Sequence, residues 1–284
     1  MTNNTDFSVI SVVLNDRTQL KRTADSLLRQ SGANFEWIVI DGGSTDGTCE
    51  LCREYAEHIA VYTSEPDNGI FDAMNKGLAH ASGNYVLFLN AGDRLCENAL
   101  EHVSASLATL SGEESMLFAA ALFEYPSGHQ YIQRPREIGD CIWHHAPASH
   151  QATFFRRDLH QKFLHDPWYR VCADYHSVCS IYVAEPQCGY LDEVVVHCEH
   201  GGDSHSHRHP LRLMREAIRT QREVLGLGSG RIAISALRRM VSFTAESLLS
   251  YRPLARIAGP VVKRLRPGGI PGRCDLPSEN RKSQ

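Results

Sequence analysis

The sequence lacks the glycine motifs of several large enzyme classes. The turn after its first strand-like segment, Leu14 to Thr18, holds no glycine, so the G-x-G-x-x-G phosphate cradle of dinucleotide enzymes is missing. No G-x-x-x-x-G-K-[S/T] loop occurs, and no G-x-S-x-G elbow follows a strand-like segment. These absences disfavour an NAD site, a P-loop ATP site and an α/β-hydrolase.

Long apolar runs are also absent. No stretch of about 18 apolar residues occurs, and Met1 to Asp6 is polar where a signal peptide would begin its apolar core. The nine cysteines are scattered, and the close pair Cys49 and Cys52 has no second pair to complete a zinc site. We therefore expect reduced thiols, a cytoplasmic protein and no membrane-spanning segment.

The 284 residues are 42% hydrophobic and 22% charged, which suits one large globular domain with an appendage. The net charge of -4 hides an asymmetry. From Arg208 onward there are 16 Lys and Arg against 5 Asp and Glu, whereas the preceding residues hold 13 against 28. A basic tail on an acidic body suggests that the tail meets something anionic.

The first 93 residues alternate between strand-like and helix-like segments. β-Branched and apolar runs predict strands at Ser8–Leu14, Phe35–Ile40, Ile59–Thr63 and Tyr85–Leu89. Apolar residues at helical spacing predict helices at 17–30 and 69–81. The glycine-rich turn Asp41–Gly47, with its capping residues, predicts a further helix that runs to about Glu57. This order predicts an α/β fold whose mostly parallel sheet is covered by helices on both faces.

Acidic residues follow three of these expected strands, namely Asp41, Asp67 and Asp93. The run Tyr85–Leu89 is apolar throughout, which is typical of a strand buried on both faces, and it ends in Asn90-Ala91-Gly92-Asp93. Ligands of such sheets bind at the carboxyl ends of the strands. We therefore expect Asn90 to Asp93 to lie where a ligand and its metal bind.

The second half of the chain is less regular. Apolar segments predict strands at 115–125, 150–155 and 193–197, and helical spacing predicts helices at 99–110, 172–182 and 211–225. Tyr131 to His150 shows no clear period. A second amphipathic segment at 232–251 carries arginines off its apolar stripe, and beyond Pro267 the composition predicts disorder.

Three blocks in the first 94 residues resemble family-2 glycosyltransferases of the GT-A fold, in the family's order and spacing. They are Asp41–Thr48 (DGGSTDGT), Ser64–Gly77 (SEPDNGIFDAMNKG) and Tyr85–Asp93 (YVLFLNAGD), which is similar to the family's metal-binding block. The Asn-Ala-Gly-Asp variant resembles enzymes that build bacterial surface polysaccharides. The resemblance implies a nucleotide-diphosphate-sugar donor, UDP- or GDP-linked, and a saccharide acceptor.

The resemblance also implies roles for single residues at the donor. Asp41 would contact the base or ribose, Asp67 would lie beside the nucleoside, and Lys76 would approach the pyrophosphate. Asn90 and Asp93 belong to the metal block, in which Asp93 would hold Mn²⁺ or Mg²⁺ to offset the charge of the departing nucleoside diphosphate. The family's usual Asp-x-Asp is reduced here, because Ala91 stands where its first Asp would fall.

Asp174 matches a later acidic position of the family and would be the general base that deprotonates the acceptor hydroxyl, so that in-line attack inverts the anomeric carbon. The alternative is a plain helix N-cap. His150 and Gln151 would line the acceptor pocket, although they could equally start a strand. In the family, a histidine on a late loop can complete the metal's shell, and His205 is our candidate for that ligand.

Five histidines crowd between residues 197 and 209, and a zinc site is one interpretation of them. A solvated polar loop is the simpler one, because no cysteine pair accompanies them at zinc-motif spacing. A metal-dependent hydrolase is therefore a weaker alternative function. Another is a non-catalytic nucleotide-sugar-binding module, which the reduced metal block would suit.

We divide the chain into a catalytic domain at 1–207, a basic amphipathic helical extension at 208–266 and a disordered end at 267–284. Basic amphipathic helices lie on anionic membrane surfaces, which favours a peripheral protein on the inner face of the cytoplasmic membrane and a lipid-linked acceptor. A helix packed on the catalytic domain is the alternative. Nucleic acid is not an expected partner, because the tail has few aromatics and no known motif.

Overall fold

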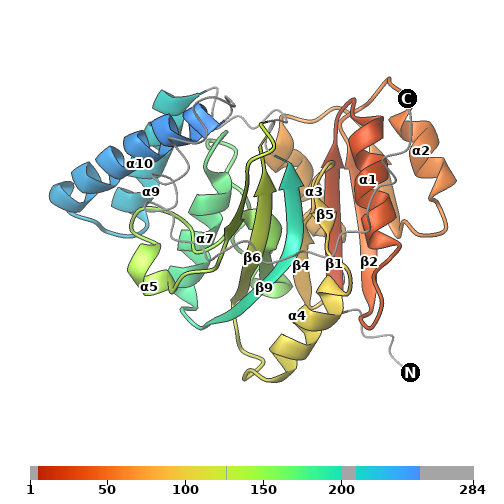
Figure 1. The fold of residues 1–284 in the computed structure, drawn as a ribbon, viewed down its shortest axis with the longest axis horizontal. Coiled ribbons are helices and arrows are strands. Elements are labelled where there is room, and N and C mark those ends of the chain that lie inside the picture. Colours follow the sequence, from red (N-terminus) through yellow and green to blue (C-terminus); the bar gives the residue numbers. More distant parts are fainter. Residues whose placement is uncertain (1–5, 126, 200–208, 250–284) are drawn as a thin grey trace.

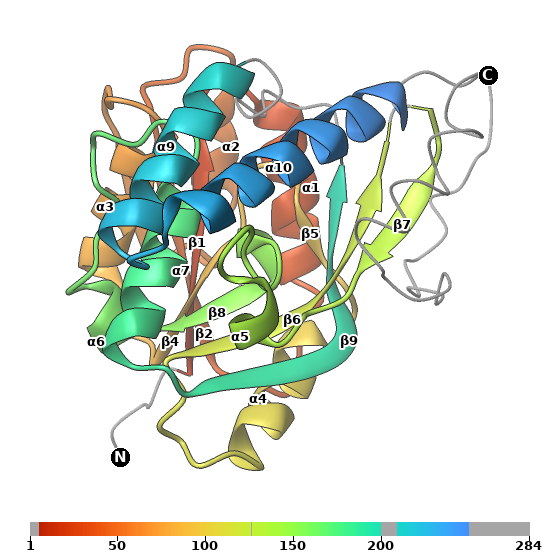
Figure 2. The same ribbon diagram turned by 90° about the vertical axis from the view of Figure 1, so that its left-hand side faces the viewer.

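The structure is a computed structural model, which describes residues 6–125, 127–199 and 209–249. A single twisted sheet runs through it, and helices cover both faces (Figures 1 and 2). One hydrophobic cluster joins one face of the sheet to helices α1 (Arg17–Leu27), α2 (Thr48–Glu54) and α4 (Ala99–Ala108). The other joins the opposite face to α3 (Ile70–His80), α5 (Ile138–Cys141), α7 (Ala173–Ala184) and α9 (Pro210–Glu223). The predicted α/β fold with two covered faces is confirmed.

Within the described residues the sheet has nine strands in the order β3-β2-β1-β4-β8-β6-β9-β5, and β7 pairs with β6. The strands are β1 (Phe7–Val13), β2 (Phe35–Asp41), β3 (Val61–Ser64), β4 (Tyr85–Phe88), β5 (Arg94–Leu95), β6 (Met116–Glu124), β7 (Gln130–Gln133), β8 (Thr153–Arg156) and β9 (Cys188–Glu199). The run β3-β2-β1-β4 is parallel, as is the pair β6 and β9. β8, β7 and β5 add antiparallel pairs to this frame.

The helices follow the strands in the predicted alternation. They are α1 (Arg17–Leu27), α2 (Thr48–Glu54), α3 (Ile70–His80), α4 (Ala99–Ala108), α5 (Ile138–Cys141), α6 (Arg157–His160), α7 (Ala173–Ala184), α9 (Pro210–Glu223) and α10 (Ser229–Leu249), with a 3-10 turn η1 (His150–Ala152). Most boundaries lie within three residues of those predicted. The segment without a clear period, 131–150, contains β7 and α5, and His150 begins η1 rather than a strand.

Burial explains why the N-terminal strands were visible in the sequence. All seven residues of β1 and all four of β4 are buried, so β4 is apolar throughout and β1 is apolar except for Ser8 and Ser11. Helix α1 begins after Asp16, whose side chain accepts a hydrogen bond from the amide of Gln19. Its buried residues, which include Leu20, Ala24 and Leu27, lie at helical spacing against the sheet.

The first helix of the expected basic extension packs on the sheet-bearing body. Ala217 of α9 is fully buried in the cluster that contains α7, and Leu213 packs against the same cluster. Helix α10 lies beside α9 (Figure 2), and the side-chain Nε2 of Gln221 donates to Ser235 Oγ over 2.6 Å. The expectations for His205 and for residues 250–284 fall outside the described residues. None of the helices in the described ranges is both long enough and apolar enough to cross a bilayer.

Candidate donor and acceptor site

The carboxyl ends of β3, β2, β1 and β4 lie at one edge of the sheet because these four strands are parallel neighbours. Asp41 is the last residue of β2, and the turns that follow the other three strands contain Asp67, Asn15 and the segment Asn90 to Asp93. The structure therefore brings together the blocks that the sequence separates by tens of residues. This edge is where ligands of such sheets bind.

The turns after β1 and β2 are tied to each other. Asn15, in a left-handed conformation with φ of 51°, donates its amide to Ser44 Oγ over 2.7 Å, and its side-chain oxygen accepts from the amide of Thr45 over 2.8 Å. The amide of Arg17 donates to Asp46 Oδ2 over 2.9 Å. Asp46 also accepts from Thr48 at the start of α2. The two turns form one fixed wall of the site.

The carboxylate of Asp41 lies inside this wall. It is fully buried at the end of β2 and accepts hydrogen bonds from the backbone and hydroxyl of Ser44, from Ser64 Oγ and from Tyr62 Oη. Buried carboxylates need such donors to offset their lost hydration. Through these hydrogen bonds Asp41 holds the turn after β2 against β3.

Asp67 and Lys76 belong to the next turn and helix. Asp67 Oδ1 accepts from the amide of Gly69 over 2.7 Å, and its Oδ2 lies so close to Gly42 that a Cβ added there would be 2.7 Å away. A side chain at residue 42 would therefore force the Asp67 carboxylate to move. Lys76 Nζ pairs with Glu65 Oε1 at 2.7 Å and donates to the carbonyl of Pro66, so it braces the Asp67 turn from below.

The backbone from Asn90 to Asp93 is held by Thr23 of α1. The Thr23 hydroxyl donates to the carbonyl of Asp93 over 2.8 Å and accepts from the amide of Gly92 over 3.0 Å. Gly92 has φ of +101°, which side-chain-bearing residues rarely adopt. Thr23 and Gly92 together set the turn that presents Asn90 and Asp93.

The side chain of Asp93 meets Cys198 because of strand register. Arg94 of β5 pairs with His197 of β9, so Asp93 lies opposite Cys198, whose thiol is hydrogen-bonded to the carboxylate. Gln151 is a second hydrogen-bond partner. Burial raises the pKa of Asp93 to about 6, while His150 and these two partners act in the opposite direction.

His150 links the metal block to Asp174. Its Nδ1 lies 3.6 Å from Asp174 Oδ2, and its Nε2 lies 3.4 Å from Asn90 Nδ2. The predicted base and the predicted metal block are thus joined through one imidazole. His150 and Gln151 lie between Asn90, Asp93 and Asp174; their expected contact with an acceptor remains a prediction.

Asp174 lies in the first turn of α7, where Cys172 rather than Asp174 is the N-cap residue. Its Oδ1 accepts from the amide of Tyr175 over 2.8 Å, and its side chain is 35% exposed. The turn that precedes α7 is held by Glu216 of α9, whose carboxylate accepts from the amides of Arg170, Val171 and Cys172. Helix α9 therefore fixes the start of α7 and with it the position of Asp174.

The oxygen donors at this site fit a divalent cation. Asn90 Oδ1 is buried and has no hydrogen-bond partner among the described residues, and the Asp93 carboxylate belongs to the same turn. Hard cations prefer such oxygen ligands, with further positions filled by phosphate oxygens or water. In the described part of the chain, no three His, Cys, Asp or Glu residues gather as a metal site by themselves. The proposed ligand His205 lies outside that part.

Sequence reasoning missed Cys198, Thr23 and Glu216. Nothing near Cys198 indicates its contact with Asp93, because that contact depends on the pairing of β5 with β9. Glu216 did leave a signal, since it falls between Leu213 and Ala217 on the apolar side of an amphipathic helix. A carboxylate in such a position is expected to have buried partners.

The chain is similar to known glycosyltransferases in sequence and in fold. Residues 8–111 match the family model described as glycosyl transferase family 2. A PGL/p-HBAD biosynthesis glycosyltransferase of Mycobacterium tuberculosis is 30% identical over 180 residues, which are 60% of this chain and 66% of the relative. An uncharacterized glycosyltransferase of the same species is 40% identical over 114 residues, or 40% of this chain and 43% of the relative. The chain thus covers less than two thirds of either relative.

Two solved structures resemble the whole described fold. S. aureus TarS in complex with UDP-GlcNAc superposes with a TM-score of 0.64 at 17% identity, over 92% of this chain and 82% of that one. The mannosyltransferase PcManGT from Pyrobaculum calidifontis, in complex with GDP-Man and Mn²⁺, gives a TM-score of 0.59 at 18% identity, over 93% and 76%. At these identities the likeness concerns the fold.

Proposed function

Because this chain belongs to the family-2 glycosyltransferases of the GT-A fold, we propose that it is an inverting glycosyltransferase. The reaction moves a sugar from a nucleotide-diphosphate-sugar, UDP- or GDP-linked, to a hydroxyl of a saccharide acceptor. The observation that carries this proposal is the contact of His150 with both Asn90 and Asp174. The proposed donor-binding residue Asn90 and the proposed base Asp174 would thus lie on opposite sides of the His150 ring.

Asp174 is the proposed general base. Its carboxylate takes the proton of the acceptor hydroxyl while the oxygen attacks the anomeric carbon, and the bond from that carbon to the donor phosphate breaks. The nucleoside diphosphate leaves from the opposite side, so the configuration inverts. The partial exposure of Asp174 leaves it accessible to an acceptor.

The wall formed by the turns after β1 and β2, together with Asp67, is the proposed nucleoside subsite. Asp41 shapes that wall from inside, and Lys76 holds the Asp67 turn within reach of the pyrophosphate. Asn90 and Asp93 are the proposed holders of Mn²⁺ or Mg²⁺, which when bound would offset the negative charge on the leaving diphosphate. His205 remains a proposed additional ligand.

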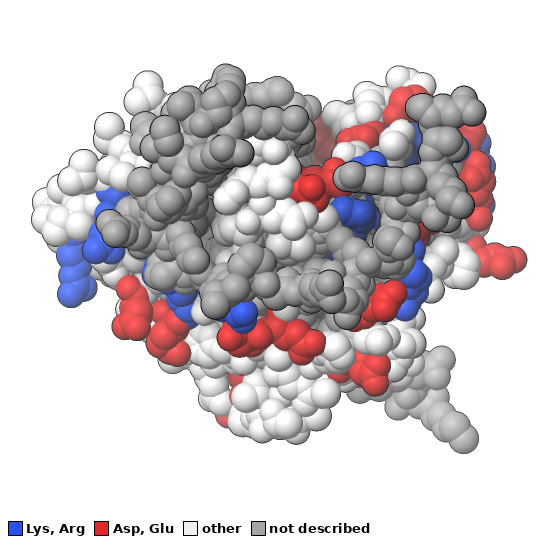
Figure 3. All heavy atoms as spheres, viewed as in Figure 1, with Lys and Arg blue, Asp and Glu red and all other residues white. Residues whose placement is uncertain are grey.

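The finer assignment is to surface polysaccharide synthesis on a lipid-linked acceptor, at the inner face of the cytoplasmic membrane. Helix α10 supports it, because Ile234 and Leu237 are exposed while Ile232 and Ser235 are buried against the body. Basic side chains lie at the left-hand edge of the molecule in Figure 3, beside α10. An exposed apolar row with arginines beside it suits an anionic lipid surface.

The experiment begins with donor binding. Melting temperature is measured with UDP, GDP, dTDP and CMP, with and without Mn²⁺, since a ligand that binds only the folded state raises it by mass action. We expect one nucleotide to raise the melting temperature and the shift to need the metal. The nucleotide-sugar of that base is then tested for transfer and slow hydrolysis.

Asp174→Asn and Asp93→Asn are the test variants. We expect Asp174→Asn to bind donor normally and to lose transfer by at least about 100-fold, the usual range for a lost general base. Asp93→Asn should lose the metal-dependent shift. Full activity in both variants would refute the mechanism, whereas donor binding without any transfer by the wild type would instead identify a binding module.

A further inference from the structure

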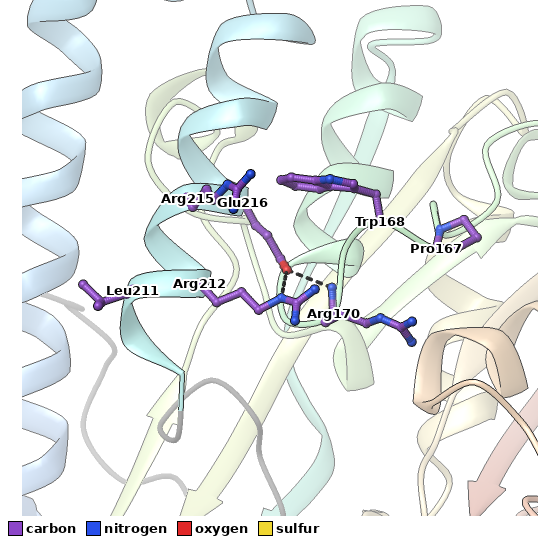
Figure 4. A pocket seen from close by; sticks show the side chains of 7 residues that line it. All are labelled: Pro167, Trp168, Arg170, Leu211, Arg212, Arg215 and Glu216. Carbon is purple, nitrogen blue, oxygen red and sulfur yellow. Dashed lines mark hydrogen bonds and ion pairs between the residues drawn. The ribbon is translucent and has the colours of Figure 1, made fainter.

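A basic pocket of about 610 Å³ opens beside the proposed base, between the loop that leads into α7 and the first turns of α9 (Figure 4). Its lining residues are Pro167, Trp168, Arg170, Leu211, Arg212, Arg215 and Glu216. The volume is within the usual range for small-molecule sites. None of the roles assigned above uses this pocket.

The pocket carries a surplus of positive charge. Three guanidinium groups line it, whereas Glu216 is its single lining carboxylate. Glu216 is 1% exposed, and its oxygens are engaged by the amides of residues 170–172 and by Arg212 Nε. The Glu216 charge is therefore balanced by donors within the protein and does not face the pocket as a free carboxylate. Within the described residues no carboxylate pairs with Arg215, whose side chain is exposed beside Trp168.

Arginine side chains from two elements, the loop before α7 and helix α9, line the pocket, which suits an anion with several oxygens. Figure 4 shows Arg212 and Arg170 below Glu216, and Arg215 at the level of the Trp168 ring. The Arg215 guanidinium carbon lies 5.6 Å from the centroid of that ring, and that of Arg219 lies 4.1 Å from it. Guanidinium groups bind phosphate oxygens in pairs, and stacking on an aromatic ring limits their freedom to move.

The pocket is joined directly to both halves of the site. The Arg170 side chain donates to the carbonyl of Asn68, next to Asp67. Arg170 and Asp174 are four positions apart, with three residues between them, so their Cα atoms are at most about 14 Å apart even along an extended chain. The pocket is therefore lined by a residue of the same short segment that carries the proposed base.

We propose that this pocket binds a phosphate group of the acceptor, and so makes the enzyme selective for phosphate-bearing saccharides. The inference rests on the proposed transferase function for the word acceptor, and on Arg170, Arg212 and Arg215 for the anion. A phosphate carries more oxygens and more negative charge than a carboxylate, so it can pair with guanidinium groups from both elements. The phosphate ester of a lipid-linked sugar and the headgroup of a membrane phospholipid share this chemistry.

The first test uses inorganic pyrophosphate as the probe, in EDTA so that no metal recruits it to Asn90 and Asp93. Binding is followed by the fluorescence of Trp168, whose ring lies beside the guanidinium groups of Arg215 and Arg219. The variant Trp168→Phe identifies the signal. We expect saturable binding that Arg215→Ala weakens at least about tenfold, the effect of losing a charge-assisted hydrogen bond. Arg222→Ala, an exposed arginine further along α9, is the matched control and should bind as wild type.

Two further ligands decide the chemistry and its source. Glucuronate should bind much more weakly than pyrophosphate; equal affinity would overturn the choice of phosphate over carboxylate. Vesicles of phosphatidylglycerol and of phosphatidylcholine test the headgroup. If Arg215→Ala sediments with the anionic vesicles as wild type does, the pocket serves the acceptor; if it loses the vesicles, the pocket is a headgroup site and the proposal is wrong.

Donor binding separates this inference from the proposed function. If Arg215→Ala keeps the nucleotide-dependent rise in melting temperature but loses pyrophosphate, the pocket is distinct from the donor subsite, as we propose. Loss of the nucleotide shift in this variant would assign the pocket to the donor and overturn the inference. If wild type shows no nucleotide shift at all, the transferase proposal fails while the pyrophosphate result still stands or falls by itself.

Discussion

His150 lies between Asn90 and Asp174, with Nδ1 3.6 Å from the Asp174 carboxylate and Nε2 3.4 Å from the Asn90 amide nitrogen. An amide nitrogen donates, so Nε2 is best assigned as the acceptor and Nδ1 as the protonated nitrogen that faces Asp174. This tautomer orients the carboxylate without giving it a second base. His150 is therefore a positioning residue for Asp174.

Replacement of His150 by Ala should lower kcat by about 10- to 100-fold, the usual effect of removing an outer-shell partner, and leave the donor dissociation constant nearly unchanged. His150→Asn should retain more activity, because its amide nitrogen can replace Nδ1–H. His80→Ala, at the exposed end of α3, is the control. A change in donor affinity that equals the change in kcat would contradict a positioning role.

Glu216→Ala should destabilise the protein by about 3 kcal/mol, because it leaves three backbone amides without their buried acceptor. Urea unfolding measures this change. Glu223→Ala, which breaks an exposed pair with Arg219 on the same helix, should change stability by less than about 1 kcal/mol.

The milder Glu216→Gln tests the link from α9 to the site. It keeps one oxygen acceptor, so the variant should fold, but residues 170–172 should lose part of their restraint. We expect a lower kcat with an unchanged donor shift in melting temperature. An unchanged kcat in a measurably destabilised variant would show that Asp174 is positioned without α9.

The N-terminal half of the site could be predicted from the sequence because its signals are local. Strands buried on both faces give apolar runs, and the turns after them hold the acidic blocks. The contacts of Asp93 with Cys198 and of Asp174 with His150 depend on the register of β9 and on the course of 131–150, which leave no periodic pattern. β9 itself is longer than Glu193–His197, because pairing with β6 rather than apolar sequence defines its first half.

His160 should make the protein sensitive to acid. Its ring is fully buried against Phe88, Phe155 and His165, and burial lowers its pKa from 6.5 to about 4, although backbone hydrogen bonds act in the opposite direction. In the unfolded chain the His160 ring is therefore protonated near pH 6.5, whereas in the folded protein it is protonated only near pH 4. Stability is fully present above pH 6.5 and falls by up to about 3 kcal/mol as pH drops to 4.

Unfolding of wild type and His160→Leu by urea across pH 4 to 7.5 measures this dependence. The leucine has no ring nitrogen to charge, so we expect its stability to fall less steeply with acid and to equal or exceed that of wild type at low pH. His58→Leu, an exposed position, should keep the wild-type slope. Parallel curves for wild type and His160→Leu would show that other groups cause the acid sensitivity.

Two of the exposed apolar side chains of α10 give the sharpest test of membrane contact. Ile234 and Leu237 are 53% and 63% exposed, so their joint replacement by Asp should leave the fold intact and remove an apolar row that lipid would bury. We expect wild type to sediment with phosphatidylglycerol vesicles, less so at high salt, and the double variant to stay in solution. Val183→Asp, an equally exposed apolar position on α7, should sediment as wild type.

Deletion of residues 227–284 should likewise abolish sedimentation with the vesicles. The rise in melting temperature on nucleotide binding should remain, because α9 and its contacts with the body are kept. The lost sedimentation would then reflect the tail and not a damaged core. Two outcomes would contradict membrane contact: wild type that does not sediment with anionic vesicles, or a double variant that still does. In either case α10 only packs on the protein, and the acceptor must reach Asp174 without help from a membrane surface.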